Sequence, residues 1–211
     1  NCGYGFPTQQ PALKCNNCQN HRADGSMQSR DDRPVTSTSD ALTSTFMAPS
    51  ESTHRSLRQS LGQFATGVTV VTARGIDGRF VGLTVNSFAS VSLDPPLILW
   101  SLTSDSRLLP SFEACTYFAV NVLAENQVDI SRRFAGTRQD KFTGLDLRVG
   151  AGDTPLIVGC CATFECRRET QYPGGDHVIF IGHVERHHRN KDAPPPLLYY
   201  GGHYRTLPPQ T

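Results

Sequence analysis

The segment VTVVTARGIDGRFVGLTVN, residues 68–86, carries the clearest sign of the protein's architecture. Val68 to Ala73 is a run rich in β-branched residues, which favours an extended strand. The turn formers Gly75-Ile76-Asp77-Gly78 follow, and Phe80 to Asn86 forms a second strand pattern. Because parallel neighbours need a long crossover connection, two strands joined by so short a turn predict an antiparallel hairpin.

Further strand patterns dominate the rest of the chain. They lie at 97–102, 117–123, 159–168 and 178–188, and a turn at Tyr172-Pro173-Gly174-Gly175 is predicted to join the last two. Short helices are predicted at 107–114 and 127–134. Helices do not alternate regularly with strands, which disfavours a doubly wound parallel sheet. The predicted fold class is mainly β, a closed or partly closed antiparallel barrel with a few short helices.

A helix is predicted upstream of the hairpin. Leu57, Leu61 and Phe64 are spaced at i, i+4 and i+7, which places them on one helix face. We expect a cap at residues 52–53 and a helix end by Gly67.

The amino-terminal quarter of the chain differs from the remainder. Residues 1–52 hold only five residues of the types Val, Ile, Leu and Phe. So little apolar surface does not offset the ordering of the backbone, which costs roughly 1–2 kcal/mol per residue. The sequence therefore predicts a flexible polar tail at 1–52, either a non-native segment or an upstream extension, and one domain at 53–208.

Composition narrows the functional classes. Among 211 residues, 20 Lys and Arg face 19 Asp and Glu, a net charge of +1, which argues against a non-specific nucleic-acid binder. No apolar run approaches the ~20 residues of a membrane span. The amino end shows no basic-then-apolar leader, so a cytoplasmic protein without nucleic-acid or membrane partners is expected.

The seven cysteines fit poorly with a disulfide scaffold, because their number is odd and Cys160 and Cys161 are adjacent. Cys15 and Cys18, with His21 close behind, form half of a zinc pattern. No second pair stands at matching spacing, and free thiols in a reducing compartment are the plainer interpretation. No metal site is predicted.

Motifs of several common enzyme classes are absent. The sequence contains no GxGxxG after a strand, no GxxxxGK[ST], no HExxH and no GxSxG. Rossmann-type dinucleotide binding, P-loop phosphate chemistry and the common hydrolases therefore lack support.

Two polar clusters are candidate anion sites. The first cluster lies where the second hairpin strand ends, and comprises Thr84, Asn86, Ser87, Ser90 and Ser92. With free backbone N–H groups, such side chains hold a phosphate. The second cluster precedes a predicted helix, which also favours an anion, and comprises Ser101, Ser104, Ser106 and Arg107. Each has a plain alternative: a strand with a solvated polar face, and a capped helix with a surface arginine.

A third candidate is Gly174-Gly175-Asp176-His177, at the start of the last long strand. The glycines permit close approach of the backbone to a flat ligand, and His177 presents an imidazole to it. The alternative is a packed or surface histidine.

Six short motifs occur in a fixed order between about Ser56 and Leu207. They are Phe64-Ala65-Thr66-Gly67-Val68-Thr69-Val70-Val71-Thr72, Gly82-Leu83-Thr84-Val85-Asn86-Ser87-Phe88, Asp94-Pro95-Pro96-Leu97, Ser131-Arg132-Arg133-Phe134-Ala135, Lys141-Phe142 and Gly175-Asp176-His177. In this order they resemble the flavin reductase family, which supplies reduced flavin to two-component monooxygenases. The resemblance implies the FMN-binding split barrel, a homodimer with flavin near the subunit interface, and a transient monooxygenase partner.

The resemblance also implies sites for FMN or FAD and for NADH or NADPH. The isoalloxazine edge would be lined, largely by backbone groups, by Thr66, Gly67, Val68, Thr69, Thr84 and Val85. The ribityl phosphate or pyrophosphate would be held by Asn86, Ser87, Ser90, Ser101, Ser106 and Arg107, with Lys141 as a further cation. The nicotinamide would lie at Gly175, Asp176 and His177, with Tyr204 in the segment that closes this side.

The implied reaction is hydride transfer from C4 of NAD(P)H to N5 of the flavin. Such a step depends on the orientation of two rings and needs no metal or covalent nucleophile. His177 is the catalytic candidate and would position the nicotinamide amide or the flavin edge. The alternative is a non-catalytic flavin or haem carrier or sensor on the same barrel, although a carrier needs no nicotinamide motif.

Overall fold

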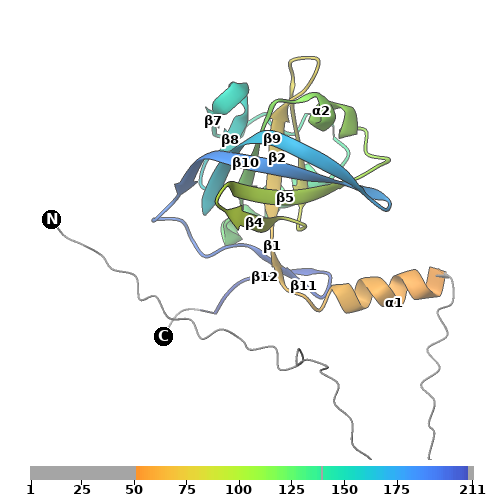
Figure 1. Ribbon diagram of the computed structural model, residues 1–211. Helices are drawn as coiled ribbons and strands as arrows, with labels where there is room; N and C mark the ends of the chain where they lie inside the picture. Colours follow the sequence, from red (N-terminus) through yellow and green to blue (C-terminus); the bar gives the residue numbers. More distant parts are fainter. Residues whose placement is uncertain (1–50, 139, 209–211) are drawn as a thin grey trace, which may run out of the picture. The chain divides into compact units, whose positions relative to one another are not determined.

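The computed structural model describes residues 51–138 and 140–208 (Figure 1). The predicted tail, except for its last two residues, and the Cys15–Cys18 pair lie outside this part of the chain. Strands β2 (Thr69–Arg74) and β3 (Phe80–Val85) form the antiparallel hairpin that the sequence predicts.

A seven-stranded antiparallel sheet builds the body of the domain. The strand order is β3-β2-β6-β9-β10-β5-β4. The further strands are β4 (Ala89–Leu93), β5 (Pro96–Thr103), β6 (Tyr117–Val122), β9 (Ala162–Gly174) and β10 (His177–Arg189). The sheet curls so that distant strands of this order approach each other: the hydroxyl of Ser87, just after β3, accepts a hydrogen bond from Ser101 N on β5 at 2.9 Å. The predicted mainly β, antiparallel barrel is confirmed.

Short elements surround this sheet. The helices are α1 (Glu51–Leu61), α2 (Leu109–Ala114) and α3 (Val128–Ala135), with 3-10 turns η1 (Glu125–Gln127) and η2 (Ala151–Asp153). Two small sheets are β7 (Leu147–Val149) with β8 (Pro155–Ile157), and β1 (Thr66–Gly67) with β11 (Leu198–Tyr200) and β12 (His203–Arg205). These strands were not predicted, because two or three residues are too few to display alternation.

The first helix differs from its prediction at both ends. Residues 52–53 lie inside α1 and do not precede it, and the helix ends at Leu61, well before Gly67. Phe64 therefore lies beyond the helix and is 78% exposed, and Leu57 is 54% exposed. The apolar spacing produces a helix, but its apolar face does not pack into the core.

The hairpin of β9 and β10 also turns later than predicted. Gly174 still pairs with His177, so the turn consists of Gly175 and Asp176. Gly175 has φ +71°, a left-handed conformation that glycine adopts without a steric cost. At its other end β9 begins at Ala162, because Gly159, with φ +83°, interrupts the extended backbone.

Aromatic packing fills the barrel. Trp100 stacks on Phe180 with ring centroids 4.6 Å apart, and Phe112 and Phe118 contact the indole edge-on. A second cluster of buried residues includes Leu123 and Phe134, the phenylalanine of α3. In residues 51–138 and 140–208, no helix combines the length and apolarity needed to cross a membrane.

Candidate functional site

A cleft of about 830 Å³ lies between three segments that are distant in the sequence. Such a volume is typical of small-molecule and cofactor sites. Its walls come from β3, from the end of β5 with the loop that follows, and from the end of α3 with residues 136–142. The apolar lining comprises Phe80, Val81, Leu83, Leu102, Leu108, Phe134 and Phe142.

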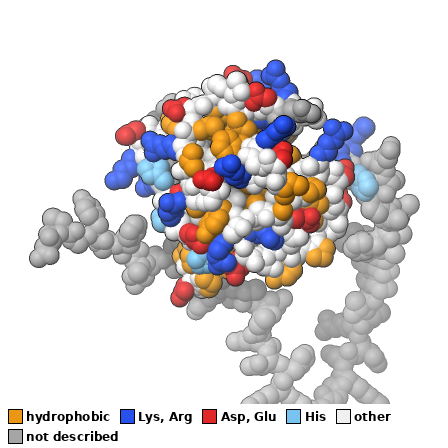
Figure 2. Space-filling model, turned by 90° about the horizontal axis from the view of Figure 1, so that it is seen from above, with side chains coloured by type: hydrophobic (Ala, Val, Ile, Leu, Met, Phe, Trp, Pro, Cys, Tyr) orange, Lys and Arg blue, Asp and Glu red, His pale blue; other side chains and the backbone are white. Residues whose placement is uncertain are grey.

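Basic side chains outnumber acidic ones around the cleft. Its lining includes Arg79, Arg107, Arg138 and Lys141 against one carboxylate, Asp77. That carboxylate lies 3.8 Å from the Arg79 guanidinium. The surplus of positive charge suits an anionic ligand. Elsewhere the surface carries both signs of charge, as the view from above shows (Figure 2).

Lys141 is buried, and its ammonium is held by main-chain carbonyls. Nζ donates to the oxygen of Phe134 at 2.9 Å and to that of Gly82 at 3.3 Å. Burial lowers the pKa of Lys141. An ammonium has three N–H donors, and among the described residues the third has no hydrogen-bond partner. Lys141 thereby ties the last turn of α3 to β3, a structural role that sequence reasoning missed.

Thr84 also lines the cleft, but its hydroxyl is engaged. Oγ1 donates to the Ser131 carbonyl on α3 at 2.7 Å. On the adjacent strand, the hydroxyl of buried Thr69 donates to Val85 O at 3.1 Å. Thr66, the first residue of β1, has a buried hydroxyl without a hydrogen-bond partner among the residues described. The hydroxyls of Thr69 and Thr84 are therefore engaged within the protein, whereas, among the residues described, that of Thr66 is not.

The predicted phosphate residues fall into three groups. Ser106 and Arg107 line the cleft together with Lys141. Ser87 and Ser101 hydrogen-bond to each other beside it. Asn86 and Ser90 are exposed and do not line the cleft.

The Gly175–His177 turn is joined to one end of the cleft. Ser104 N donates to Asp176 O at 2.9 Å, and His177 pairs in register with Thr103, which lines the cleft. His177 Nδ1 lies 2.7 Å from the Asp176 carboxylate, and this hydrogen bond lowers the pKa of Asp176. When Nδ1 donates, Nε2 is left as an acceptor. The histidine itself is not part of the cleft lining.

Tyr204, on β12, contacts α3. Its hydroxyl hydrogen-bonds with that of Ser131 on α3 at 2.9 Å. Within the described residues, no hydrogen bond or ring contact joins it to the Gly175–His177 turn.

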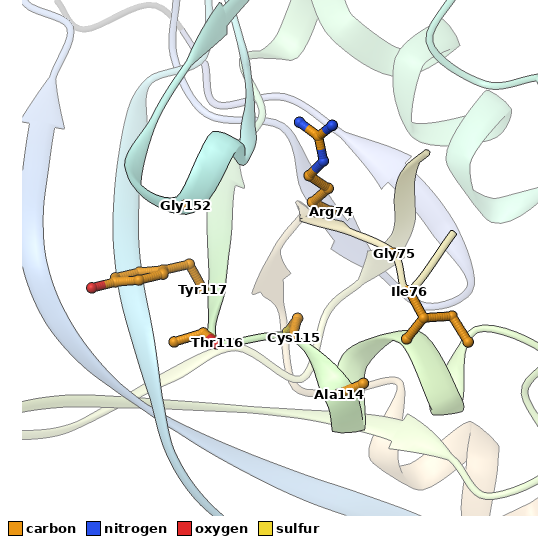
Figure 3. A pocket seen from close by; sticks show the side chains of 8 residues that line it. All are labelled: Arg74, Gly75, Ile76, Ala114, Cys115, Thr116, Tyr117 and Gly152. Atoms are coloured by element: carbon orange, nitrogen blue, oxygen red, sulfur yellow. The ribbon is translucent and has the colours of Figure 1, made fainter. Parts of the chain in front are cut away.

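A smaller pocket of about 420 Å³ lies beside the β2–β3 turn (Figure 3). Arg74, Ile76, Cys115 and Tyr117 surround it. The Arg74 guanidinium is paired with Asp153 at 3.3 Å. Burial raises the pKa of the Cys115 thiol to about 11, so it stays protonated near neutral pH and is a poor nucleophile.

Sequence reasoning did not assign the cleft residues Arg79, Arg138, Phe134 and Phe142. Arg79 follows a turn and reads as a surface residue. The Ser131–Ala135 and Lys141-Phe142 motifs were available signals, but nothing local indicates that they face β3.

The profile of the Flavin reductase like domain matches residues 61–208. The chain belongs to the flavin reductase-like family. The resemblance inferred from the six motifs is thereby confirmed, and with it the split antiparallel barrel.

Named relatives agree with this assignment. FMN reductase (NADH) SmoA of Agrobacterium fabrum is 47% identical over 156 residues, which cover 73% of this chain and 86% of the relative. HsaB of Mycobacterium tuberculosis, the reductase subunit of a flavin-dependent monooxygenase, is 41% identical over 74% of this chain and 83% of its own. The structure of Streptomyces globisporus NADH:FAD oxidoreductase SgcE6, in complex with NAD and FAD fragments, superimposes with a TM-score of 0.71. It is 38% identical and covers 77% of this chain and 98% of the other.

The cleft fits a flavin by its own chemistry. Its apolar wall suits an aromatic ring system, and the surplus of cations suits a phosphate. Among the described residues, one N–H of Lys141 has no hydrogen-bond partner and is available to a ligand. Arg107 and Lys141 would hold the phosphate, and the main chain near Thr66 and Thr84 would face the ring.

Proposed function

We propose that the protein is an NAD(P)H:flavin oxidoreductase that passes a hydride from reduced nicotinamide to FMN or FAD. It supplies the reduced flavin to a partner monooxygenase, and the name of HsaB, reductase subunit of a flavin-dependent monooxygenase, supports this role. The observation that carries the proposal is the cleft, where an apolar wall meets four cations and the Ser106 hydroxyl. Family membership supports the same reaction.

In this proposal the chain binds and orients. Ser106, Arg107 and Lys141 hold the flavin phosphate, and main-chain groups at 66–69 and 84–85 lie along the ring edge. Bound flavin supplies the hydride acceptor. Holding two reactants in the reacting orientation can lower the activation free energy by ~7–11 kcal/mol.

The Gly175–His177 turn is proposed as the nicotinamide site. Its attachment to Thr103 and Ser104 brings it to the end of the cleft. The Asp176 carboxylate fixes the imidazole of His177 by a 2.7 Å hydrogen bond. The ring then presents Nε2 to the nicotinamide amide, whose N–H groups need an acceptor.

Anaerobic mixing tests the activity. FMN or FAD is combined with NADH or NADPH and a catalytic amount of protein, and loss of the flavin's visible absorbance is followed. Rapid bleaching is expected, and the four combinations reveal both cofactor preferences. Flavin binding without bleaching beyond the protein-free rate would instead indicate a carrier.

One pair of variants ties the activity to the cleft. Arg107→Gln removes a cation from its lining and is expected to raise the KM for flavin about 10-fold, since hydrogen bonds to charged groups contribute ~1.5–3 kcal/mol. The exposed Arg148, on β7, serves as the control, and Arg148→Gln should leave the KM unchanged. Equal effects of both variants would contradict the assignment of the phosphate site.

We also propose that the protein is a homodimer that acts in the cytoplasm, where reduced nicotinamide is available. Ile98 and Trp100 face the core, so the alternating residues Leu97 and Leu99 face outward. Ile181 pairs directly with Leu99 and lies on the same outer face. These side chains are only half-buried in the single chain, and a second copy would cover them.

A further inference from the structure

A chain of contacts leads from the cleft to the carboxyl-terminal hairpin of β11 and β12. Thr84, on the cleft wall, donates to the carbonyl of Ser131 at 2.7 Å. Ser131 has no exposed surface, and its hydroxyl lies 2.9 Å from the hydroxyl of Tyr204 on β12. Ser131 thus contacts Thr84 of the cleft wall through its carbonyl and Tyr204 of the hairpin through its hydroxyl.

The ring of Tyr204 makes two contacts of its own. The Arg132 guanidinium lies 5.8 Å from the ring centroid, a cation–π contact. Tyr199 packs edge-on at 5.6 Å. Tyr199 in turn pairs in register with Thr66 on β1, so the hairpin reaches a second predicted flavin contact. Figure 1 shows β1, β11 and β12 side by side below the main sheet.

We propose that Tyr204 is a positioning residue for the flavin, acting through Ser131 on Thr84 and through Tyr199 on Thr66. The inference rests on the proposed function, because it concerns the same cofactor. It gives Tyr204 a role different from the one expected from the sequence, which was to close the nicotinamide side. The hydroxyl of Tyr204 is already used by Ser131 and its ring contacts two neighbours, so it has little left with which to bind a second cofactor.

The hairpin carries a matched control for this role. Tyr200 lies four residues before Tyr204, and its hydroxyl donates to the Gln63 side chain at 2.9 Å. That hydrogen bond is exposed and leads away from α3. Tyr200→Phe and Tyr204→Phe therefore remove the same group from the same hairpin, but only Tyr204→Phe breaks the contact with Ser131.

The test is the dissociation constant of flavin, measured by fluorescence titration of the full-length protein without nicotinamide. Tyr204→Phe and Ser131→Ala are each expected to weaken flavin binding about 2- to 10-fold, as the loss of one hydrogen bond predicts. The double variant should bind flavin no more weakly than the single variant with the larger effect, because the two substitutions remove the same interaction. Tyr200→Phe should bind flavin as the unaltered protein does.

Steady-state kinetics separate positioning from nicotinamide contact. Tyr204→Phe should raise the KM for flavin and leave the KM for NAD(P)H within 2-fold. Unchanged flavin affinity, additive effects of the two variants, or a rise confined to the nicotinamide KM would each overturn the inference. If the unaltered protein binds no flavin, the proposed function falls as well, whereas normal binding by Tyr204→Phe contradicts the positioning role alone.

Discussion

At the scale of single residues, Asn121 is the polar group on which the centre of the sheet depends. It is fully buried, and its amide donates to Val70 O at 3.0 Å and to the Thr72 hydroxyl at 3.1 Å. Its side-chain oxygen accepts from Ile157 N at 2.9 Å. The Thr72 hydroxyl continues to Pro155 O at 2.6 Å, so the network fastens β8 to β2 and β6.

Asn121→Ala is expected to lower the free energy of unfolding by about 2–4 kcal/mol, because it leaves buried main-chain groups without partners. Denaturant unfolding, followed by the fluorescence of Trp100, the only tryptophan, measures the loss. Asn126 is exposed, and Asn126→Ala should change stability by less than about 0.5 kcal/mol. Similar losses in both variants would contradict the role of the network.

At the scale of secondary structure elements, the β9–β10 hairpin places the predicted nicotinamide turn. The turn depends on Gly175, whose φ of +71° is unfavourable for any residue with a Cβ. Nothing lies within 4 Å of the position that a Cβ would occupy there, so a substitution meets conformational strain and no steric clash.

Gly175→Ala is expected to cost about 1–2 kcal/mol of stability and to raise the KM for NAD(P)H more than that for flavin. Gly136 offers a comparison, because its φ is −78° and an added Cβ would meet only ordinary contacts. Gly136→Ala should leave stability almost unchanged. Thermal unfolding of the two variants and steady-state kinetics of Gly175→Ala are the measurements. Equal stability of the two variants would show that the turn tolerates a side chain.

At the scale of the whole molecule, the proposed homodimer depends on the outer face of β5 and β10. We expect light scattering to give a mass near twice that of the 23.1 kDa chain. Ile181→Arg places a charge on this face and should yield a monomer. Ile76 is 72% exposed on the β2–β3 turn, so Ile76→Arg should remain dimeric. A monomeric unaltered protein would refute the proposal.

The sequence alone determined the long strands and their hairpins, because these depend on local properties. The β-branched run at 68–73 and the turn at 75–78 lie within one short segment, so their pattern predicts β2 and β3 directly. The order of the six motifs also identified the family. Where local signals were short or ambiguous, as at the end of α1 and in the strands of two or three residues, prediction failed.

Only the tertiary structure determined how the cleft is assembled. Its walls combine β3, the loop after β5 and the residues after α3, and no local pattern specifies which distant segments meet. Lys141 illustrates this, since its hydrogen bond to Gly82 O joins groups 59 residues apart. Ser131 and Tyr204 are 73 residues apart and share one hydrogen bond. Such contacts form because α3 packs against β3 in the folded protein. This packing is stabilised by the burial of the whole core and not by any local segment.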